Sequence, residues 1–216
     1  MNLWNRLCEK YNYELELIER FKECIKSISY QNHGILPMEA FALCKYIEDN
    51  EITVVLESGT AHGYSTEILG RMYPNIKITT VDWLENYGKE SQNATQKRLS
   101  YLDNISFIIG DSRKEFPKLI KIFNEEKIAV FIDGPKKERG TTLAMDCLKY
   151  DNVVFSSCHD QKIQGKGRYS PNLDTEFSER YKFLNNEVNT IIHPDYESKT
   201  LGEQYPNGMG ITFFLS

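Results

Sequence analysis

The sequence predicts an α/β protein built around a doubly wound, mainly parallel sheet with helices on both faces. Five short runs rich in β-branched residues recur along the chain, and each run is nearly all apolar, which is typical of strands buried on both faces. Stretches long enough to form a helix separate the runs, and this alternation favours a parallel sheet. The five runs are 52–57, 76–82, 105–111, 128–133 and 152–160.

The first 50 residues differ from the rest of the chain because they lack strand-like alternation. Apolar residues recur there in steps of three and four, which indicates one face of a helix. A second helix is expected from Pro37 to about Glu48, since proline is favoured in the first helical turn. We therefore expect an N-terminal helical cap over 1–50, followed by a part that carries the sheet over 51–216. The residues of the first pattern are Leu15, Ile18, Phe21, Ile25 and Ile28.

Two further features concern the second half of the chain. Ser112 with Glu115 predicts a capping box at the start of the helix that follows the third run. After residue 161 the alternation breaks, and 162–177 is polar and punctuated by Gly and Pro, as in a lid or a mobile loop. Two more strands are expected near the C-terminus, at 188–193 and 210–216.

Composition limits the size of the protein, its partners and its compartment. With 216 residues, 40% of them hydrophobic, the chain is long enough for one sizeable core. A net charge of -5 argues against a nucleic-acid or anionic-membrane partner bound through bulk charge. Five cysteines without a CxxC pair argue against a disulfide framework, and no apolar run approaches the roughly 20 residues of a membrane span. We expect a cytoplasmic protein, and a homodimer is left open.

An acidic residue stands at or just past the end of each of the five predicted strands. Because the ends of parallel strands share one edge of a sheet, these carboxylates should gather where open α/β folds bind ligands. Carboxylates gathered in this way repel one another, so cations or hydroxyl donors must offset them. Helix capping, which accepts Ser, Thr and Asn as readily as Asp, explains one or two of the positions rather than all five. The five acids are Glu57, Asp82, Asp111, Asp133 and Asp160.

The segment after the first strand narrows the class of ligand. Gly59 and Gly63 do not form the G-x-G-x-x-G pattern of dinucleotide sites, and the chain has no GxxxxGK[ST] phosphate loop. A ligand with a positive centre and a ribose fits the acids better. S-adenosylmethionine has a sulfonium, an ammonium, a carboxylate and a ribose diol. Asp82, which ends the second strand, is placed to accept hydrogen bonds from the ribose hydroxyls.

These residues carry a resemblance to a known family. The pattern ExGxxxGYS at 57–65 resembles the first motif of class I S-adenosylmethionine-dependent methyltransferases and is particularly similar to the catechol O-methyltransferase group. Together with Asp82 and the segments GDS and FIDGPK, the resemblance covers about residues 53–161. It implies a Rossmann-like sheet of six parallel strands and one antiparallel strand, the latter formed by 210–216.

The resemblance also implies roles in cofactor binding. Ser65 would hold the methionine carboxylate, Asp82 the ribose, and Asp111 with Ser112 the adenine edge, while Trp83 would cover the adenine face. The residues expected at the cofactor are Glu57, Gly59, Gly63, Ser65, Asp82, Trp83, Asp111, Ser112 and Asp133.

At the reacting centre, the resemblance implies a metal and a general base. Asp133, Asp160 and Gln161 would bind Mg²⁺ or another divalent cation through oxygen atoms, although Gln161 is longer than the amide of the catechol pattern. Lys136 would accept the proton of the substrate hydroxyl. His159 is an alternative base that the catechol pattern lacks. In that metal-free version, Asp133 faces the ammonium group of the cofactor.

The sequence thus predicts an S-adenosylmethionine-dependent O-methyltransferase that acts on a hydroxyl of a small-molecule acceptor, such as a sugar, a polyol or a phenol. Two alternatives stay open. One is a metal-independent methyltransferase that acts on nitrogen or another acceptor, and the other is a module that binds the cofactor without turning it over. The acceptor itself has no readable signature, because loops that form such pockets vary while the scaffold persists.

Overall fold

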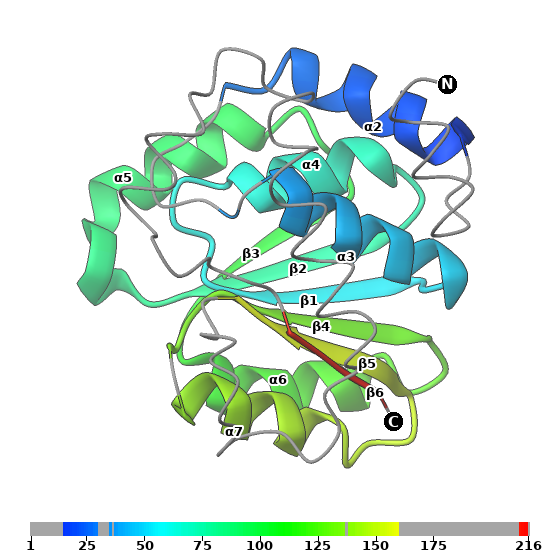
Figure 1. Cartoon of the computed structure of the whole chain (residues 1–216). Coiled ribbons are helices and arrows are strands. Elements are labelled where there is room, and N and C mark those ends of the chain that lie inside the picture. The colour runs from blue at the N-terminus through cyan, green and yellow to red at the C-terminus, as the bar shows by residue number, and fades with distance from the viewer. Residues whose placement is uncertain (1–14, 30–34, 36, 137, 160–211, 216) are drawn as a thin grey trace.

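The computed structural model describes residues 15–29, 35, 37–136, 138–159 and 212–215, and its centre is a six-stranded sheet with the order β3-β2-β1-β4-β5-β6 (Figure 1). The first five strands are parallel, and β6 runs antiparallel to β5. The strands are β1 (Val54–Ser58), β2 (Lys77–Asp82), β3 (Ile105–Ile109), β4 (Ile128–Ile132), β5 (Val153–Cys158) and β6 (Thr212–Leu215).

The predicted fold class is confirmed. Each of the five apolar runs forms a strand, and the C-terminal run forms the antiparallel strand that was expected. The resemblance implied a sixth parallel strand, but the run proposed for it, 188–193, lies outside the described residues. All side chains of β1 and β4 are buried, and the apolar residues of both strands fit this burial, although β1 ends in the buried polar residues Glu57 and Ser58.

Helices cover both faces of the sheet (Figure 1). One face carries α2 (Leu15–Lys26), α3 (Pro37–Asp49), α4 (Tyr64–Met72) and α5 (Leu84–Leu99), and the opposite face carries α6 (Ser112–Ile122) and α7 (Glu138–Cys147).

The N-terminal helices share the core of the sheet, because α3 packs on β5 while α2 packs on α3 and α4. The rings of Phe21 and Phe41 meet edge to face with their centroids 5.2 Å apart, and Tyr46 meets Phe155 of β5 at 5.7 Å. Burying one side chain of this size stabilises the fold by about 1.5–3 kcal/mol. The helical faces predicted from the sequence therefore point to the same core as the strands.

The start of α6 differs from the expectation. The predicted capping box of Ser112 and Glu115 is wrong, because the N-cap residue is Asp111, whose carboxylate accepts a hydrogen bond from the Arg113 N–H at 3.0 Å. Glu115 instead pairs with Lys118 on the helix surface. Both Asp and Ser are favoured caps, and the carboxylate one residue earlier takes the position.

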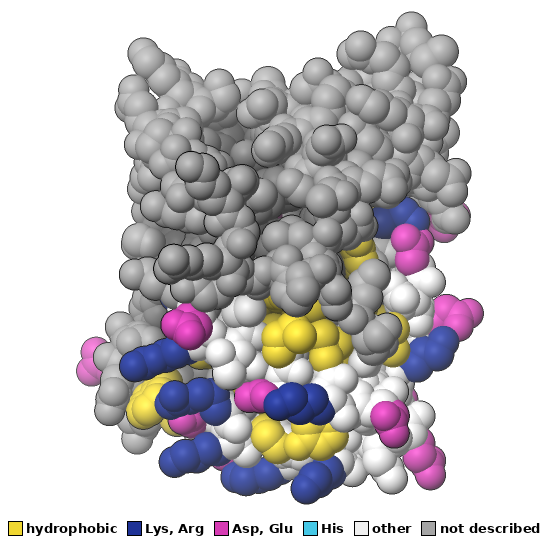
Figure 2. Space-filling model, turned by 60° about the horizontal axis from the view of Figure 1, so that its bottom comes forward, with side chains coloured by type: hydrophobic (Ala, Val, Ile, Leu, Met, Phe, Trp, Pro, Cys, Tyr) yellow, Lys and Arg dark blue, Asp and Glu magenta, His cyan; other side chains and the backbone are white. Residues whose placement is uncertain are grey.

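The face formed by α6 and α7 is polar and of mixed charge. In the described part of this face, Lys and Arg alternate with Asp and Glu around small hydrophobic patches (Figure 2). A cavity of about 610 Å³ opens between the two helices, with Pro117, Leu143 and Tyr150 among its lining residues. None of the lining residues has a predicted role. In the described part of the chain, no helix is both long and apolar enough to cross a membrane.

The strand order places a switch point in the middle of the sheet. The chain moves outward from β1 through β2 to β3 on one side, and then returns to build β4 and β5 on the other side. Ligands of doubly wound folds bind at the carboxyl ends of the strands at such a point, here between β1 and β4. The candidate site lies there.

Candidate functional site

The loop between β1 and α4, residues 59–63, has an unusual backbone and is called the glycine loop below. Gly59 and Gly63 have φ angles of 96° and 72°, and Ala61 between them has a φ of 44°. A Cβ atom on Gly59 would lie 3.0 Å from the backbone nitrogen of Gly134. Glycine at this position therefore allows the loop after β1 to approach the loop after β4 at the switch point.

Asp82 holds the glycine loop from the end of β2. Its Oδ2 accepts a hydrogen bond from the Ala61 N–H at 2.7 Å, and its Oδ1 accepts one from the Trp83 N–H, also at 2.7 Å. Burial raises the pKa of Asp82, although these backbone donors act in the opposite direction. Asp82, the residue predicted to bind the ribose, thus fixes the backbone of the glycine loop at Ala61 and its own neighbour Trp83.

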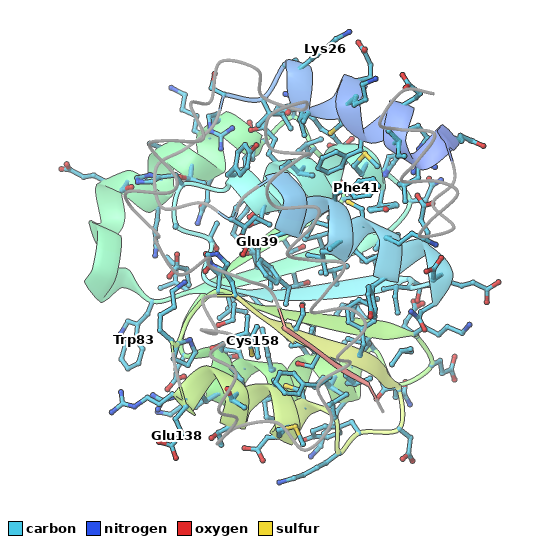
Figure 3. All side chains as sticks on the ribbon, viewed as in Figure 1. Lys26, Glu39, Phe41, Trp83, Glu138 and Cys158 are labelled. Atoms are coloured by element: carbon cyan, nitrogen blue, oxygen red, sulfur yellow. The ribbon has the colours of Figure 1, made fainter. Side chains whose placement is uncertain are left out.

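Trp83 follows Asp82 directly and is 44% exposed. Its ring projects outward at this edge of the molecule (Figure 3). An exposed aromatic ring next to the Asp82 carboxylate can stack on a flat ligand such as a purine.

Glu57 is fully buried beneath the start of α4. Its two carboxylate oxygens accept hydrogen bonds from the hydroxyls of Ser65 and Thr66, each at 2.5 Å. Burial, with a smaller effect of the neighbouring Asp133, raises the pKa of Glu57 to about 7, against the effect of these hydroxyl donors. Ser65 and Glu57 are both predicted to lie at the cofactor. In the structure they contact each other, and this contact sets the position of the first turn of α4.

Ser58 joins three segments of the site. Its hydroxyl lies 2.7 Å from the hydroxyl of Ser112 at the start of α6 and contacts the Gly134 carbonyl. Its own carbonyl accepts the N–H groups of Asp133 and Gly134, at 2.8 and 3.0 Å. The predicted adenine residue Ser112 is buried at this junction. Its neighbour Asp111 caps α6 and pairs with Arg113, which lowers the pKa of the Asp111 carboxyl.

Asp133 follows β4 and is the centre of a charged cluster. Its Oδ1 lies 2.5 Å from Nδ1 of His159 and also contacts the ammonium group of Lys136. Burial alone would raise the pKa of Asp133, but His159 and Lys136 outweigh it and lower the pKa. Asp133 is therefore an anion that faces two cations.

His159, which follows β5, is buried between two carboxylates. Its Nε2 lies 3.0 Å from Oε2 of Glu39, a fully buried residue of α3. Burial opposes a charge on the ring, but Glu39 and Asp133 together raise the pKa of His159 to about 10. An imidazolium has no lone pair with which to accept a proton, so this arrangement disfavours His159 as the base. Lys136, which is 45% exposed, can reach a substrate.

The predicted metal site is described only in part. Asp133 lies in the site, whereas Asp160 and Gln161 lie outside the described residues. Where side chains are described, no group of three His, Cys, Asp or Glu residues could hold a metal ion. Asp133, the one described residue of the predicted metal site, already faces Lys136 and His159, and these two positive groups would repel a divalent cation.

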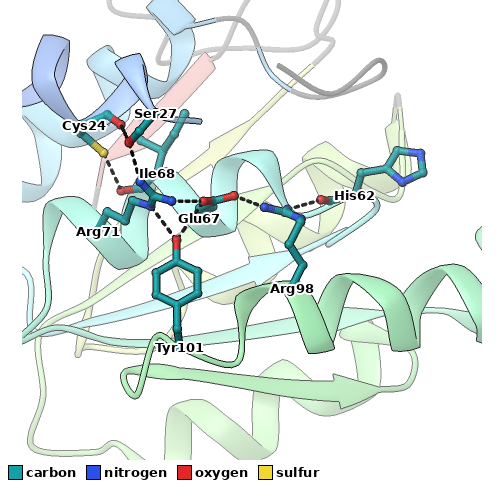
Figure 4. A network of polar contacts seen from close by, with 8 residues as sticks. All are labelled: Cys24, Ser27, His62, Glu67, Ile68, Arg71, Arg98 and Tyr101. Carbon is teal, nitrogen blue, oxygen red and sulfur yellow. Dashed lines mark hydrogen bonds and ion pairs between the residues drawn. The ribbon is translucent and has the colours of Figure 1, made fainter. Parts of the chain in front are cut away.

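Three polar residues of this region were missed by the sequence analysis. Glu39 contacts His159, and Figure 3 shows it on α3 above the sheet. Glu67 of α4 and Arg98 of α5 form a network beside the glycine loop, with Arg98 bonded to the His62 carbonyl (Figure 4). Glu39 could have been noticed as the one acid within the otherwise apolar segment 38–44. Arg98 offers no such signal.

The sequence matches no protein-family model and no curated protein. Among solved structures, the chain is similar to the SAH-bound methyltransferase PaMTH1 of Podospora anserina, with 16% identity, a TM-score of 0.52, and coverage of 97% of this chain and 92% of that chain. It is also similar to cofactor-bound Rv0187 from MTB, with 18% identity, a TM-score of 0.50, and coverage of 85% and 83%. Likeness at this identity shows that the chain has the Rossmann-like fold of these proteins.

Proposed function

We propose that this protein is an S-adenosylmethionine-dependent O-methyltransferase that transfers a methyl group to a hydroxyl of a small molecule, such as a sugar, a polyol or a phenol. One observation carries the proposal. At the switch point of the sheet, the Asp82 carboxylate accepts a hydrogen bond from the glycine loop, next to the cluster of Asp133, Lys136 and His159. The proposed nucleoside site thus adjoins Lys136, a half-exposed lysine.

The cofactor is proposed to lie across the carboxyl ends of β1, β2 and β4. Asp82 would accept the ribose hydroxyls, and Trp83 would cover the adenine, whose edge would face Asp111 and Ser112. Gly59 and Gly63, with their positive φ angles, shape the loop that the ligand would approach, and the backbone N–H groups at the N-terminus of α4, at Ser65, would receive the methionine carboxylate. Two supports for this placement are the exposure of Trp83 and the fixed orientation of Asp82.

Methyl transfer requires alignment and the removal of one proton. The acceptor oxygen attacks the methyl carbon, the carbon–sulfur bond breaks, and its electron pair stays on sulfur to give S-adenosylhomocysteine. Lys136, which stands as an ammonium group beside Asp133, must first lose its own proton to solvent. It then accepts the hydroxyl proton, and Asp133 stabilises the ammonium group that results. Much of the rate enhancement then comes from positioning the two reactants in line.

His159 is proposed to orient Asp133 rather than to accept the proton. Its imidazolium bridges Asp133 and Glu39, so the Asp133 carboxylate has a fixed direction toward Lys136. The predicted divalent cation, with Asp133, Asp160 and Gln161 as ligands, stays a prediction, and no step above depends on it.

Release of S-adenosylhomocysteine in the presence of a panel of sugars, polyols and phenols tests the proposal. We expect turnover with at least one hydroxyl acceptor, and loss of turnover in Lys136→Ala. Turnover that EDTA does not change would remove the metal but leave methyl transfer intact. Transfer only to amines would point to the nitrogen-directed alternative. Tight cofactor binding without turnover of any acceptor would contradict the proposed activity and favour a binding module.

A further inference from the structure

The glycine loop is held by side chains of α5 to which no role has been assigned. Ala61 has a positive φ of 44°, a conformation that costs free energy in a residue other than glycine and persists only where the surroundings enforce it. Asp82 holds the Ala61 N–H from one side. From the other side, the Thr95 hydroxyl lies 3.4 Å from the Ala61 carbonyl. Hydrogen bonds from the end of β2 and from α5 therefore hold the loop on both sides.

Arg98, in the last turn of α5, makes the shorter contact from this side. Its Nη2 donates a hydrogen bond to the His62 carbonyl at 2.7 Å (Figure 4). Its Nη1 pairs with a carboxylate oxygen of Glu67 on α4. One guanidinium thus connects the loop to the helix that follows it. A hydrogen bond from a charged donor is roughly twice as strong as one between neutral groups.

Glu67 is a fixed anchor for Arg98. The side chain is only 5% exposed, and its second oxygen accepts hydrogen bonds from Arg71 at 2.6 Å and from the Tyr101 hydroxyl at 2.8 Å. A buried carboxylate that is bonded on both oxygens has little freedom to move. The guanidinium of Arg98 therefore takes its position from a rigid part of the fold rather than from solvent.

The packing of α5 leaves the loop no space to relax toward this helix. A Cβ atom on Gly63 would lie 2.8 Å from side-chain carbons of both Leu99 and Thr95, and 3.3 Å from Nη2 of Arg98. The end of the loop is thus in tight contact with the same turn of α5 that carries Arg98.

We propose that Arg98 is a positioning residue for cofactor binding, which holds the glycine loop through the His62 carbonyl while Glu67 anchors its guanidinium. The inference rests on the proposed function, because the loop forms part of the proposed cofactor site. Arg98 acts through the loop backbone, so its loss should weaken the binding of S-adenosylmethionine more than it slows methyl transfer from the bound cofactor.

The chain contains a matched control for Arg98. Arg71 pairs with the same carboxylate, but its other hydrogen bonds go to the Ser27 hydroxyl and the Tyr101 hydroxyl, each at 2.6 Å, and not to the loop (Figure 4). Both substitutions remove a cation from Glu67. Only the substitution of Arg98 also removes the bond to His62.

The test compares Arg98→Met with Arg71→Met in the full chain. Calorimetric titration with S-adenosylmethionine and S-adenosylhomocysteine should show Kd raised about tenfold in Arg98→Met, equivalent to about 1.4 kcal/mol, and within twofold of wild type in Arg71→Met. Thermal unfolding should show a lower Tm in both. With an active acceptor, Arg98→Met should raise KM for the cofactor about tenfold and leave kcat within twofold.

Equal affinities in the two variants, or a Kd for Arg98→Met that matches wild type, would overturn the inference. Should Arg98→Met not fold, Arg98→Lys takes its place, because its single ammonium keeps the pair with Glu67 but lacks the second branch toward His62. A Kd for Arg98→Lys equal to wild type would also overturn the inference. Failure of the wild-type protein to bind either compound is a different result, which defeats the proposed function itself.

Discussion

Glu39 of α3 lies 3.0 Å from His159 at the end of β5, and both side chains are buried. Through His159, Glu39 connects the N-terminal helices to Asp133 at the centre of the candidate site. The His159 imidazolium has a carboxylate next to each ring nitrogen, so Glu39, His159 and Asp133 form one buried charged unit. Removing any of the three destabilises the fold, because it leaves a buried charge without compensation.

Glu39→Gln tests this unit through stability. Removing one partner from a buried ion pair leaves the other charge poorly compensated, and we expect the free energy of unfolding to fall by about 3–5 kcal/mol. Urea denaturation at pH 7 measures the change. The control is Glu48→Gln on the same helix, which removes a partly exposed pair with Arg20 and should cost about 1 kcal/mol or less. Similar losses in both variants would contradict the buried charged unit.

Glu57 predicts a pH dependence of stability. Its pKa is raised to about 7 in the folded protein, mainly by burial, from a usual value of 4.5. A raised pKa means that the folded state binds more protons than the unfolded state between these values, so the contribution is full below pH 4.5 and is lost as pH rises through 7. The free energy of unfolding of the wild type should therefore fall, relative to Glu57→Gln, between pH 5 and 8.

Urea denaturation at several pH values in this window checks the prediction. Glu51→Gln is the control, because the partner Lys127 lowers the pKa of this surface residue and keeps it ionised throughout the window. The difference between wild type and Glu51→Gln should not change with pH. A constant difference between wild type and Glu57→Gln would show that Glu57 does not titrate in this range.

Asp82→Asn should weaken cofactor binding. The amide keeps one acceptor oxygen where the carboxylate has two, so either the Ala61 N–H or the Trp83 N–H loses its partner. A ribose diol would also lose a charged acceptor. We expect Kd for S-adenosylmethionine to rise at least tenfold by calorimetry. Asp103→Asn, at an exposed position, serves as the control and should leave Kd within twofold.

Lys136→Met separates proton removal from binding. Loss of a general base lowers rates by roughly 10²–10⁴-fold, so kcat should fall at least 100-fold while Kd for the cofactor stays within threefold. Lys149→Met is a matched control, because Lys149 pairs with Asp146 three residues earlier, just as Lys136 pairs with Asp133. Its kcat should be unchanged. A loss of less than tenfold in Lys136→Met would remove this lysine as the base.

The sequence was sufficient for the sheet and for the strand ends at which Glu57, Asp82 and Asp133 lie. Strands buried on both faces are mostly apolar, and Asp82 and Asp133 stand where the runs of β2 and β4 end. The N-cap of α6 was misplaced by one residue, because Asp111 and Ser112 are both favoured caps and local sequence does not decide between them.

Contacts between distant helices could not be predicted in the same way. Glu67 and Arg98 read as ordinary charges on helix surfaces, and only the packing of α4 against α5 buries the carboxylate and directs the guanidinium to the loop. Glu39 is anomalous in its apolar segment, but nothing in the sequence identifies His159 as its partner. Such pairings depend on tertiary structure rather than on local pattern.

Gly63→Ala tests whether the glycine loop is as constrained as its contacts indicate. Gly63 has a φ of 72°, and an added Cβ would lie 2.8 Å from both Leu99 and Thr95, so alanine must strain the backbone and displace α5. We expect a loss of about 1–3 kcal/mol in the free energy of unfolding, with weaker cofactor binding. Gly134→Ala is the control, because its Cβ would meet no atom within 4 Å and should change stability by about 0.5 kcal/mol or less. Equal stability of the two variants would mean that α5 yields readily, and the loop would then lack the rigid support inferred for Arg98.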